Sequence, residues 1–174
     1  MTLEPMIQHL KDEFEKFWDI LEKQIEVCPE TLWGAKAGNY FYWQQIWHVM
    51  VSSELATIED PKVRTPSVDK YSWDVVMLSK TLDHVPPKAE MLEESRRIKK
   101  MALDYFNGLS VASLLLPHPR MSNRFGKPKT KLHAALALIR HVNYHIGSCD
   151  TALREHGHPG VLSIPDGLKH EYEA

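Results

Sequence analysis

The segment from Thr130 to His156 reads TKLHAALALIRHVNYHIGSCDTALREH, and it decides how the chain folds. With each residue placed at about 100° per step, the rotation of an α-helix, the apolar side chains fill one broad arc. That arc holds Ala134, Ala135, Leu138, Ile139, Val142, Ile146 and Leu153. Gly157 follows directly and is a typical C-terminal stop. The segment therefore predicts one long amphipathic helix from about residue 130 to 156.

Three earlier segments repeat apolar residues at the same helical spacing, and prolines lie near their ends: about residues 5–27, 40–58 and 88–109. No segment shows the alternation of a strand. The connections over residues 59–87 and 109–129 are long and rich in proline, and a short helix is expected over about 72–82. Four amphipathic helices predict an all-α fold, a four-helix bundle with long connections after its second and third helices.

The length of 174 residues suits one domain with a hydrophobic core. We expect a single helical domain over residues 1–174, in which about 158–174 form a C-terminal tail. The formal net charge of −2 lacks the basic surplus of nucleic-acid-binding proteins. No stretch approaches the ~20 apolar residues of a membrane span, and the N-terminus lacks a signal pattern. These features predict a cytoplasmic protein that contacts neither nucleic acid nor membrane.

Two histidines, His141 and His145, stand four residues apart at the border of the apolar arc. Side chains at this spacing lie one turn apart on the same helix face, so both imidazoles should point into the bundle. A buried polar group without a partner costs roughly 1–3 kcal/mol, and one metal ion can serve two imidazoles at once. His48 lies half-way along the second predicted helix, beside its apolar stripe, and is the candidate third ligand.

Three neutral imidazoles leave a coordination position for water or substrate, as catalytic zinc sites do. Zinc, nickel, copper and iron all accept imidazole, so the ligand types alone do not fix the metal. The alternative is that no metal binds and that hydrogen bonds within the core satisfy all three histidines. The other histidines are expected to be solvated: His9, His84, His118, His133, His156, His158 and His170.

Two further residues are candidates beside the metal. Cys149 is one turn beyond His145 and is a fourth ligand, a reactive thiolate or, as free cysteines commonly are, a small buried residue. Glu54 lies in the apolar stripe of the second helix, where a carboxylate needs a partner. It is the one candidate catalytic residue, either a general base or a support for an imidazole. Its helical angle, about 120° from His48, favours an ordinary ion pair instead.

Two stretches resemble the DinB/YfiT-like superfamily. Residues 139–157 share the pattern of its last helix: His, three residues, His, one residue, Gly, and then a Leu-Arg-x-x-Gly ending. Residues 44–54, QQIWHVMVSSE, are similar to its second helix, which carries the remaining ligand histidine. The order of the helices also matches, over about residues 5–157. Ser148 departs from the pattern, because many members have glutamine after the glycine.

The resemblance implies an up-down-down-up bundle, a homodimer, and one divalent metal ion, zinc or nickel, on His48, His141 and His145. Some members are S-transferases that use a low-molecular-weight thiol. We therefore expect a metal-dependent transferase acting on a small electrophile. Four aromatic residues are candidates to wall its pocket, although core packing is favoured for Trp47: Trp43, Trp47, Tyr71 and Trp73. The alternatives are a non-catalytic metal-stabilised bundle, a ligand-binding or stress-related protein, or a metal-dependent hydrolase.

Overall fold

A computed structural model of the protein describes residues 4–161, and these are mostly helical. The four long helices are α1 (Glu4–Val27), α3 (Tyr42–Thr57), α6 (Lys88–Asn107) and α8 (Lys131–Glu155). The short ones are α2 (Glu30–Trp33), α4 (Pro66–Tyr71), α5 (Trp73–Val76) and α7 (Pro119–Phe125). The expected all-α class is confirmed, and each long helix begins and ends within about two residues of its expected bounds, as apolar periodicity allows.

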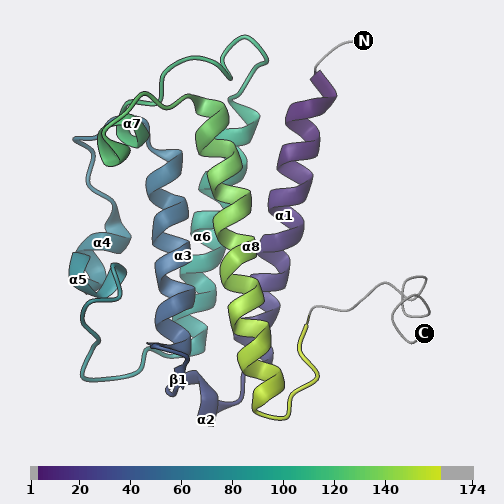
Figure 1. Ribbon diagram of the computed structural model, residues 1–174, viewed down its shortest axis with the longest axis vertical. Coiled ribbons are helices and arrows are strands. Elements are labelled where there is room, and N and C mark those ends of the chain that lie inside the picture. Colours follow the sequence, from purple (N-terminus) through teal and green to yellow (C-terminus); the bar gives the residue numbers. More distant parts are fainter. Residues whose placement is uncertain (1–3, 162–174) are drawn as a thin grey trace.

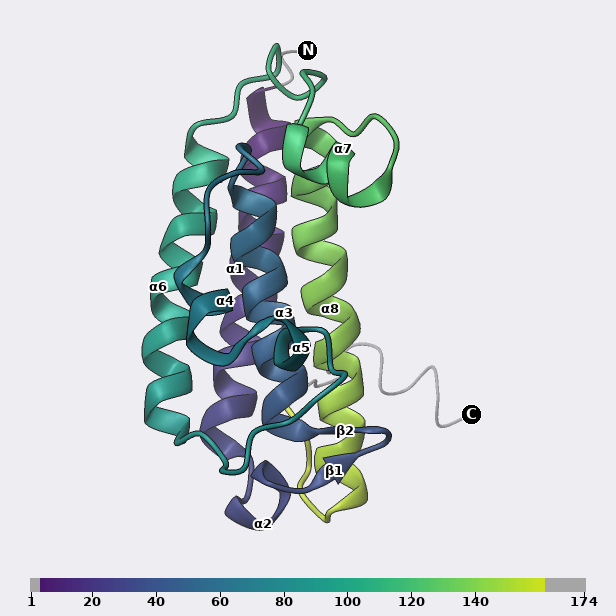
Figure 2. The ribbon, with the colours of Figure 1, turned by 90° about the vertical axis from the view of Figure 1, so that its left-hand side faces the viewer.

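The long helices lie side by side, and each of α1 and α3 packs against both α6 and α8 (Figures 1 and 2). Helices α1 and α8 run in one direction and α3 and α6 in the other (Figure 1). Since α3 and α6 run the same way, the chain between them must return along their length. The return segment contains α4 and α5, which pack on the outer side of α3.

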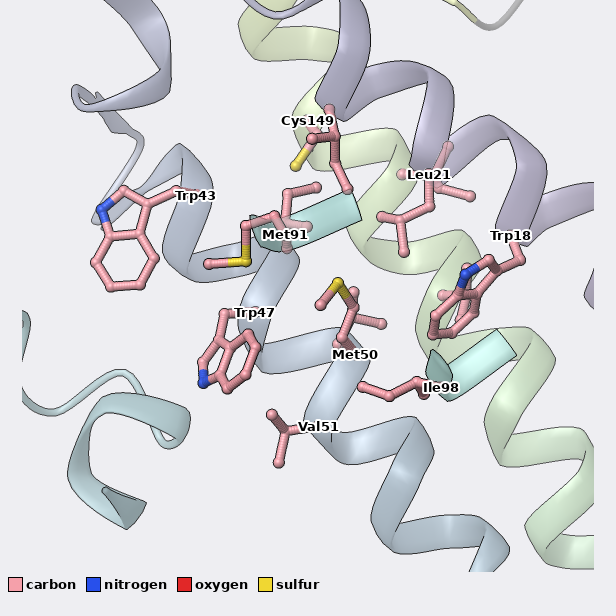
Figure 3. Close-up of a cluster of buried hydrophobic side chains, with 14 of the residues drawn as sticks. Trp18, Leu21, Trp43, Trp47, Met50, Val51, Met91, Ile98 and Cys149 are labelled. Carbon is pink, nitrogen blue, oxygen red and sulfur yellow. The ribbon is translucent and has the colours of Figure 1, made fainter. Parts of the chain in front are cut away.

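The core between the helices is filled by large apolar side chains with no exposed surface, among them Trp47, Met50, Met91 and Ile98 (Figure 3). Trp18 brings a polar atom into this core, and its indole N–H donates to Ser95 Oγ at 2.8 Å. Burying these side chains supplies the main driving force for packing the amphipathic faces together. In the described part of the chain, no helix has the length and apolar character needed to traverse a lipid bilayer.

Local elements differ from the sequence-based expectations where no periodic pattern exists. The only strands among residues 4–161 are β1 (Lys36–Ala37) and β2 (Tyr40–Phe41), which pair antiparallel with Ala37 opposite Tyr40. Strands of two residues are too short to show alternation. The short helix expected over residues 72–82 is present only as α5, over 73–76, and α4, over 66–71, was not expected. Ser72 and Leu78 have φ of 68° and 62°, which interrupts a continuous helix at both positions.

His118 corrects one expectation about the histidines. It was expected to be solvated but has no exposed surface. Its Nε2 lies 3.0 Å from the carbonyl of Ala56, and its Nδ1 accepts the backbone N–H of Met121 at the start of α7. A capping role of this kind buries a loop histidine without any apolar pattern around it. His9, His84, His133 and His156 are exposed and His158 is half-buried, while His170 lies outside the described residues.

Candidate metal centre

Helices α3 and α8 bring three histidines together. His48 comes from the middle of α3, and His141 and His145 come from one face of α8, which packs along α3. The Nε2 atom of His141 lies 3.2 Å from Nε2 of His48 and 3.2 Å from Nε2 of His145. One ligand atom from each of the three lies within 4.8 Å of the others. The three side chains predicted from the sequence are therefore close enough to hold a metal ion.

The cluster is largely withdrawn from water. His145 is buried, with 5% of its surface exposed, and the other two are half-buried. Burial, together with a smaller effect of the neighbouring imidazoles, lowers the pKa of His145 to about 3 and that of His141 to about 4. Burial also lowers the pKa of His48. All three imidazoles are thus neutral at pH 7, the form that binds metals.

A backbone carbonyl fixes the tautomer of His48. Its Nδ1 lies 2.6 Å from the carbonyl oxygen of Val76, at the end of α5. A carbonyl only accepts, so Nδ1 carries the proton, and Nε2 of the neutral ring presents a lone pair to His141. Carbonyls that accept the outer N–H of metal-bound histidines orient the rings in this way. The connection that returns beside α3 therefore prepares one imidazole for coordination.

Hydrogen bonds cannot satisfy both close contacts in the cluster. His141 Nε2 either carries one proton or presents one lone pair. If it carries the proton, it donates to His48 or to His145 but not fully to both. If it presents a lone pair, it faces the lone pair of His48. Nδ1 of His145 is also buried without a hydrogen-bond partner among the described residues.

A divalent metal resolves this arrangement, since it accepts three lone pairs at the same time. Zinc binds imidazole nitrogen at about 2.0–2.1 Å, which puts two nitrogens of a tetrahedral site roughly 3.3–3.4 Å apart. The two separations of 3.2 Å are close to that value. The donor set of three neutral nitrogens also suits nickel, copper or iron. The residues present therefore fit a divalent ion, and their types do not choose among these metals.

Comparison of the chain with protein-family models, with curated proteins and with solved structures gives no match. The site must therefore be interpreted from its own geometry and chemistry.

The cluster opens on a cavity of about 420 Å³. Besides the three histidines, its lining includes the β1–β2 turn, Gln45, Leu78, Tyr144 and Ser148. Ser148 donates to Gln45 Oε1 at 2.9 Å, and Gln45 Nε2 donates to the carbonyl of Ala37 at 3.0 Å. These hydrogen bonds link α8 to α3, and α3 to the β1–β2 hairpin that lines the cavity. Ser148, which departs from the superfamily pattern, thus has a defined structural partner here.

Glu54 lies on another side of α3. Its side chain has no exposed surface, and its Oε1 lies 2.7 Å from Nη1 of Arg97 on α6. The expected alternative of an arginine partner is therefore what the structure shows. Glu54 belongs neither to the group of ligand atoms nor to the lining of the cavity at the histidines.

Cys149 is free and buried, and Figure 3 shows it in the same apolar cluster as Leu21 and Met91. Burial raises the pKa of its thiol well above the usual range, which disfavours a thiolate. It is not part of the histidine group. Its surroundings match the third expectation, that of a small buried residue.

The aromatic residues expected to wall a pocket lie elsewhere. Trp43 and Trp47 are buried and pack on Tyr71, whose ring centroid is 4.7 Å from that of Trp47. Trp73 is 47% exposed and lines a separate cavity of about 240 Å³ with residues of α7. None of the four lines the cavity at the histidines. Core packing thus explains Trp43, Trp47 and Tyr71.

Sequence reasoning missed several groups around the histidines. The carbonyl of Val76 has no signal in the sequence, because any residue type supplies a carbonyl. Gln45 and Ser148 lie on the same helix faces as the ligands, three residues from His48 and His145, so helical spacing was an available signal. Two arginines near His141, Arg124 and Arg140, were also missed.

Proposed function

We propose that this protein binds one divalent metal ion, zinc or nickel, through Nε2 of His48, His141 and His145. The observation that carries the proposal is the position of His141 Nε2, 3.2 Å from two other imidazole nitrogens. The tautomer of His48 rules out a complete hydrogen-bonded alternative for three neutral rings. Neither a hydrogen bond nor an ion pair links any of the three to a carboxylate in the described chain.

We further propose that the four long helices form an up-down-down-up bundle of the DinB/YfiT-like kind. Three observations support this proposal. The helices run in the directions that such a bundle requires (Figure 1). The single ligand histidine lies on the second long helix, and the pair lies on the last. The long return connection stands between the second and third long helices.

The reaction that this site supports best is transfer of a low-molecular-weight thiol to a small electrophile. A divalent ion beside a thiol favours its ionised form, so that the thiol proton leaves to solvent. The thiolate sulfur then forms a bond to the electrophilic carbon, and the leaving group departs with its electron pair. His48, His141 and His145 hold the ion, and the cavity with Tyr144, Gln45 and Ser148 receives the reactants.

The linings of the cavities at the histidines contain no aspartate or glutamate. A water molecule that attacks a substrate commonly transfers its proton to such a base. A thiol that is ionised beside the metal needs none. A water molecule bound to a divalent ion would ionise in the same way, so the absence of a carboxylate does not separate S-transfer from hydrolysis.

The test is a thiol-transfer assay on protein loaded with zinc or nickel, with glutathione or cysteine as the thiol and chlorodinitrobenzene as the electrophile. We expect turnover above the uncatalysed rate that is lost in His141→Ala. His9→Ala is the matched control, because His9 is an exposed histidine on α1. Turnover that is equal in wild type and His141→Ala would contradict the assignment of the reaction to this site.

One observation favours a second function, a non-catalytic metal staple. His48 and His141 are 93 residues apart in sequence, so a shared ion would link α3 to α8 directly. If metal-loaded protein shows no transfer with any of these thiols but gains thermal stability that His141→Ala abolishes, the staple replaces the transferase.

A further inference from the structure

A second cavity adjoins the histidines. It measures about 300 Å³ and lies between α3, α7 and α8. His141 and Tyr144 line both this cavity and the one described above, so the two cavities adjoin at these residues. A volume of this size is at the lower end of cavities that hold small organic ligands.

Two arginines give this second cavity its charge. Arg124 comes from α7 and Arg140 from α8, and both are among its lining residues. The positive charges of both contribute to the lowered pKa of His141, and that of Arg124 also acts on His48. The lining contains no acidic residue, so no carboxylate of its walls neutralises the charge of the two arginines.

Neither arginine is engaged elsewhere in residues 4–161. No ion pair or hydrogen bond joins Arg124 or Arg140 to another described residue, and Arg124 only stacks near the ring of its neighbour Phe125. Arg120, one turn before Arg124, is different because it donates to the carbonyls of Ile58, Asp60 and Val63. Partial burial lowers the pKa of Arg124, while its side chain stays accessible from solvent.

We infer that this cavity binds the oxyanion group of a substrate, a carboxylate or a phosphate, through Arg124 and Arg140, with the reacting end of that molecule beside His141. A guanidinium presents a planar fork of donors that matches either oxyanion. The inference rests on the proposed metal site for the position of the reacting end. It narrows the substrate class to thiols or electrophiles that carry an anionic group a few bonds from the reacting atom.

The first part of the test needs no metal. Metal-free protein is titrated with succinate and with inorganic phosphate at constant ionic strength, and binding is followed by calorimetry. We expect saturable binding of at least one anion, lost in the double variant Arg124→Gln/Arg140→Gln. Each single variant, Arg124→Gln or Arg140→Gln, is compared with Arg96→Gln, which removes the same single charge from an exposed position of α6 outside the cavity. The tighter of the two anions identifies the oxyanion as a carboxylate or a phosphate.

The second part tests whether the anionic group binds beside the metal. Cobalt-loaded protein is titrated with 3-mercaptopropionate and with its neutral analogue 3-mercapto-1-propanol, and the cobalt spectrum reports thiol binding. We expect the anionic thiol to bind about tenfold more tightly, a preference of about 1.4 kcal/mol. The arginine double variant should remove this preference and leave the affinity for the neutral thiol unchanged.

The outcomes separate the two proposals. If cobalt does not bind, the proposed metal site fails, while the anion titration still tests the arginine pair. If cobalt binds but both thiols bind equally, the metal site stands and the inference is overturned. Loss of the preference in Arg96→Gln as well would also overturn it, because general surface charge would then be the cause.

Discussion

Helix α3 carries polar side chains on two of its sides, and the two environments differ in the charge of the groups that meet there. Toward α6, the carboxylate of Glu54 meets the guanidinium of Arg97 at 2.7 Å, so a buried charge has an opposite charge beside it. Toward α8, three neutral imidazoles meet with nitrogens 3.2 Å apart. The first pair brings opposite charges together, although Oε2 of Glu54 has no hydrogen-bond partner among the described residues. In the second cluster, no placement of protons on three neutral rings satisfies both contacts of His141.

This difference shows how a structural polar group is distinguished from a binding one. Burial alone does not separate them, because Glu54 is at least as buried as the histidines. The charges and protons of the neighbouring groups do separate them. Arg97 supplies donors that a carboxylate accepts, but no neutral tautomer of His141 satisfies both neighbours. We therefore propose that the α3–α6 pair serves stability and that the α3–α8 cluster serves ligand binding.

The largest expected effect comes from breaking the ion pair between Glu54 and Arg97. Arg97→Met leaves the Glu54 carboxylate buried without its partner, and removal of one member of a buried pair costs about 3–5 kcal/mol. Because Arg97 is 35% exposed, we expect a value near the lower limit, measured as the free energy of unfolding in urea. Glu54→Gln/Arg97→Met should recover part of the loss. A change below about 1 kcal/mol in Arg97→Met would contradict a stabilising role for the pair.

The next largest effect is expected from adding a metal ion to the histidine cluster. Zinc at about one hundred times its dissociation constant should raise the free energy of unfolding of metal-free protein by about 2.7 kcal/mol, since the ion binds only the folded site. Thermal unfolding with and without zinc measures this increment. Arg97→Met should retain it in full, and His145→Gln should lose it. Retention in His145→Gln would remove that residue from the ligand set.

A pH profile of metal-free protein sharpens the comparison further. The pKa of His145 is lowered to about 3 and that of His141 to about 4, while an unfolded histidine titrates near about 6.5. Between these values the unfolded chain binds more protons than the folded protein, so the free energy of unfolding falls as the pH drops from about 6.5. Urea unfolding at pH 7.5, 6 and 5 should show this fall. His141→Gln/His145→Gln should have a flatter profile, while an unchanged profile would contradict the buried, neutral state of the cluster.

The smallest effect concerns Cys149. Its position in the apolar cluster predicts that Cys149→Ala lowers the free energy of unfolding by about 1 kcal/mol, the common size of a modest core truncation. The number of zinc ions bound per chain should not change. A lower zinc content in Cys149→Ala, at unchanged fold by circular dichroism, would show that the thiol belongs to the site after all.

The sequence predicted the long helices and the inward face of His141 and His145 because both depend on periodicity. His48 was expected as the third histidine from its place beside the apolar stripe of the second helix and from the family resemblance. Apolar spacing fixed the four helix bounds, and the four-residue step from His141 to His145 fixed their shared face. The all-α class followed from those helices. The partner of Glu54 was only one of several options, because a helical angle gives the side of α3 but not which residue of α6 lies opposite.

The parts that escaped prediction are those that depend on tertiary contacts of irregular segments. The Val76 carbonyl meets His48 only because the return connection places α5 against α3, and a carbonyl leaves no trace in residue type. The burial of His118 follows from its capping contacts around α7, which was itself not foreseen. Arg124 reaches the histidine cluster for the same reason, since α7 folds back over α3 and α8.

The most direct test of the central claim is the metal content of the purified protein. Chelator-treated protein is incubated with zinc or nickel, freed of excess metal, and measured by elemental analysis alongside His48→Ala, His141→Ala, His145→Ala and the control His9→Ala. We predict close to one equivalent in wild type and His9→Ala and a loss of bound metal in each of the three ligand variants. Less than about a tenth of an equivalent in wild type, or equal content in all five proteins, would contradict the three-histidine metal site.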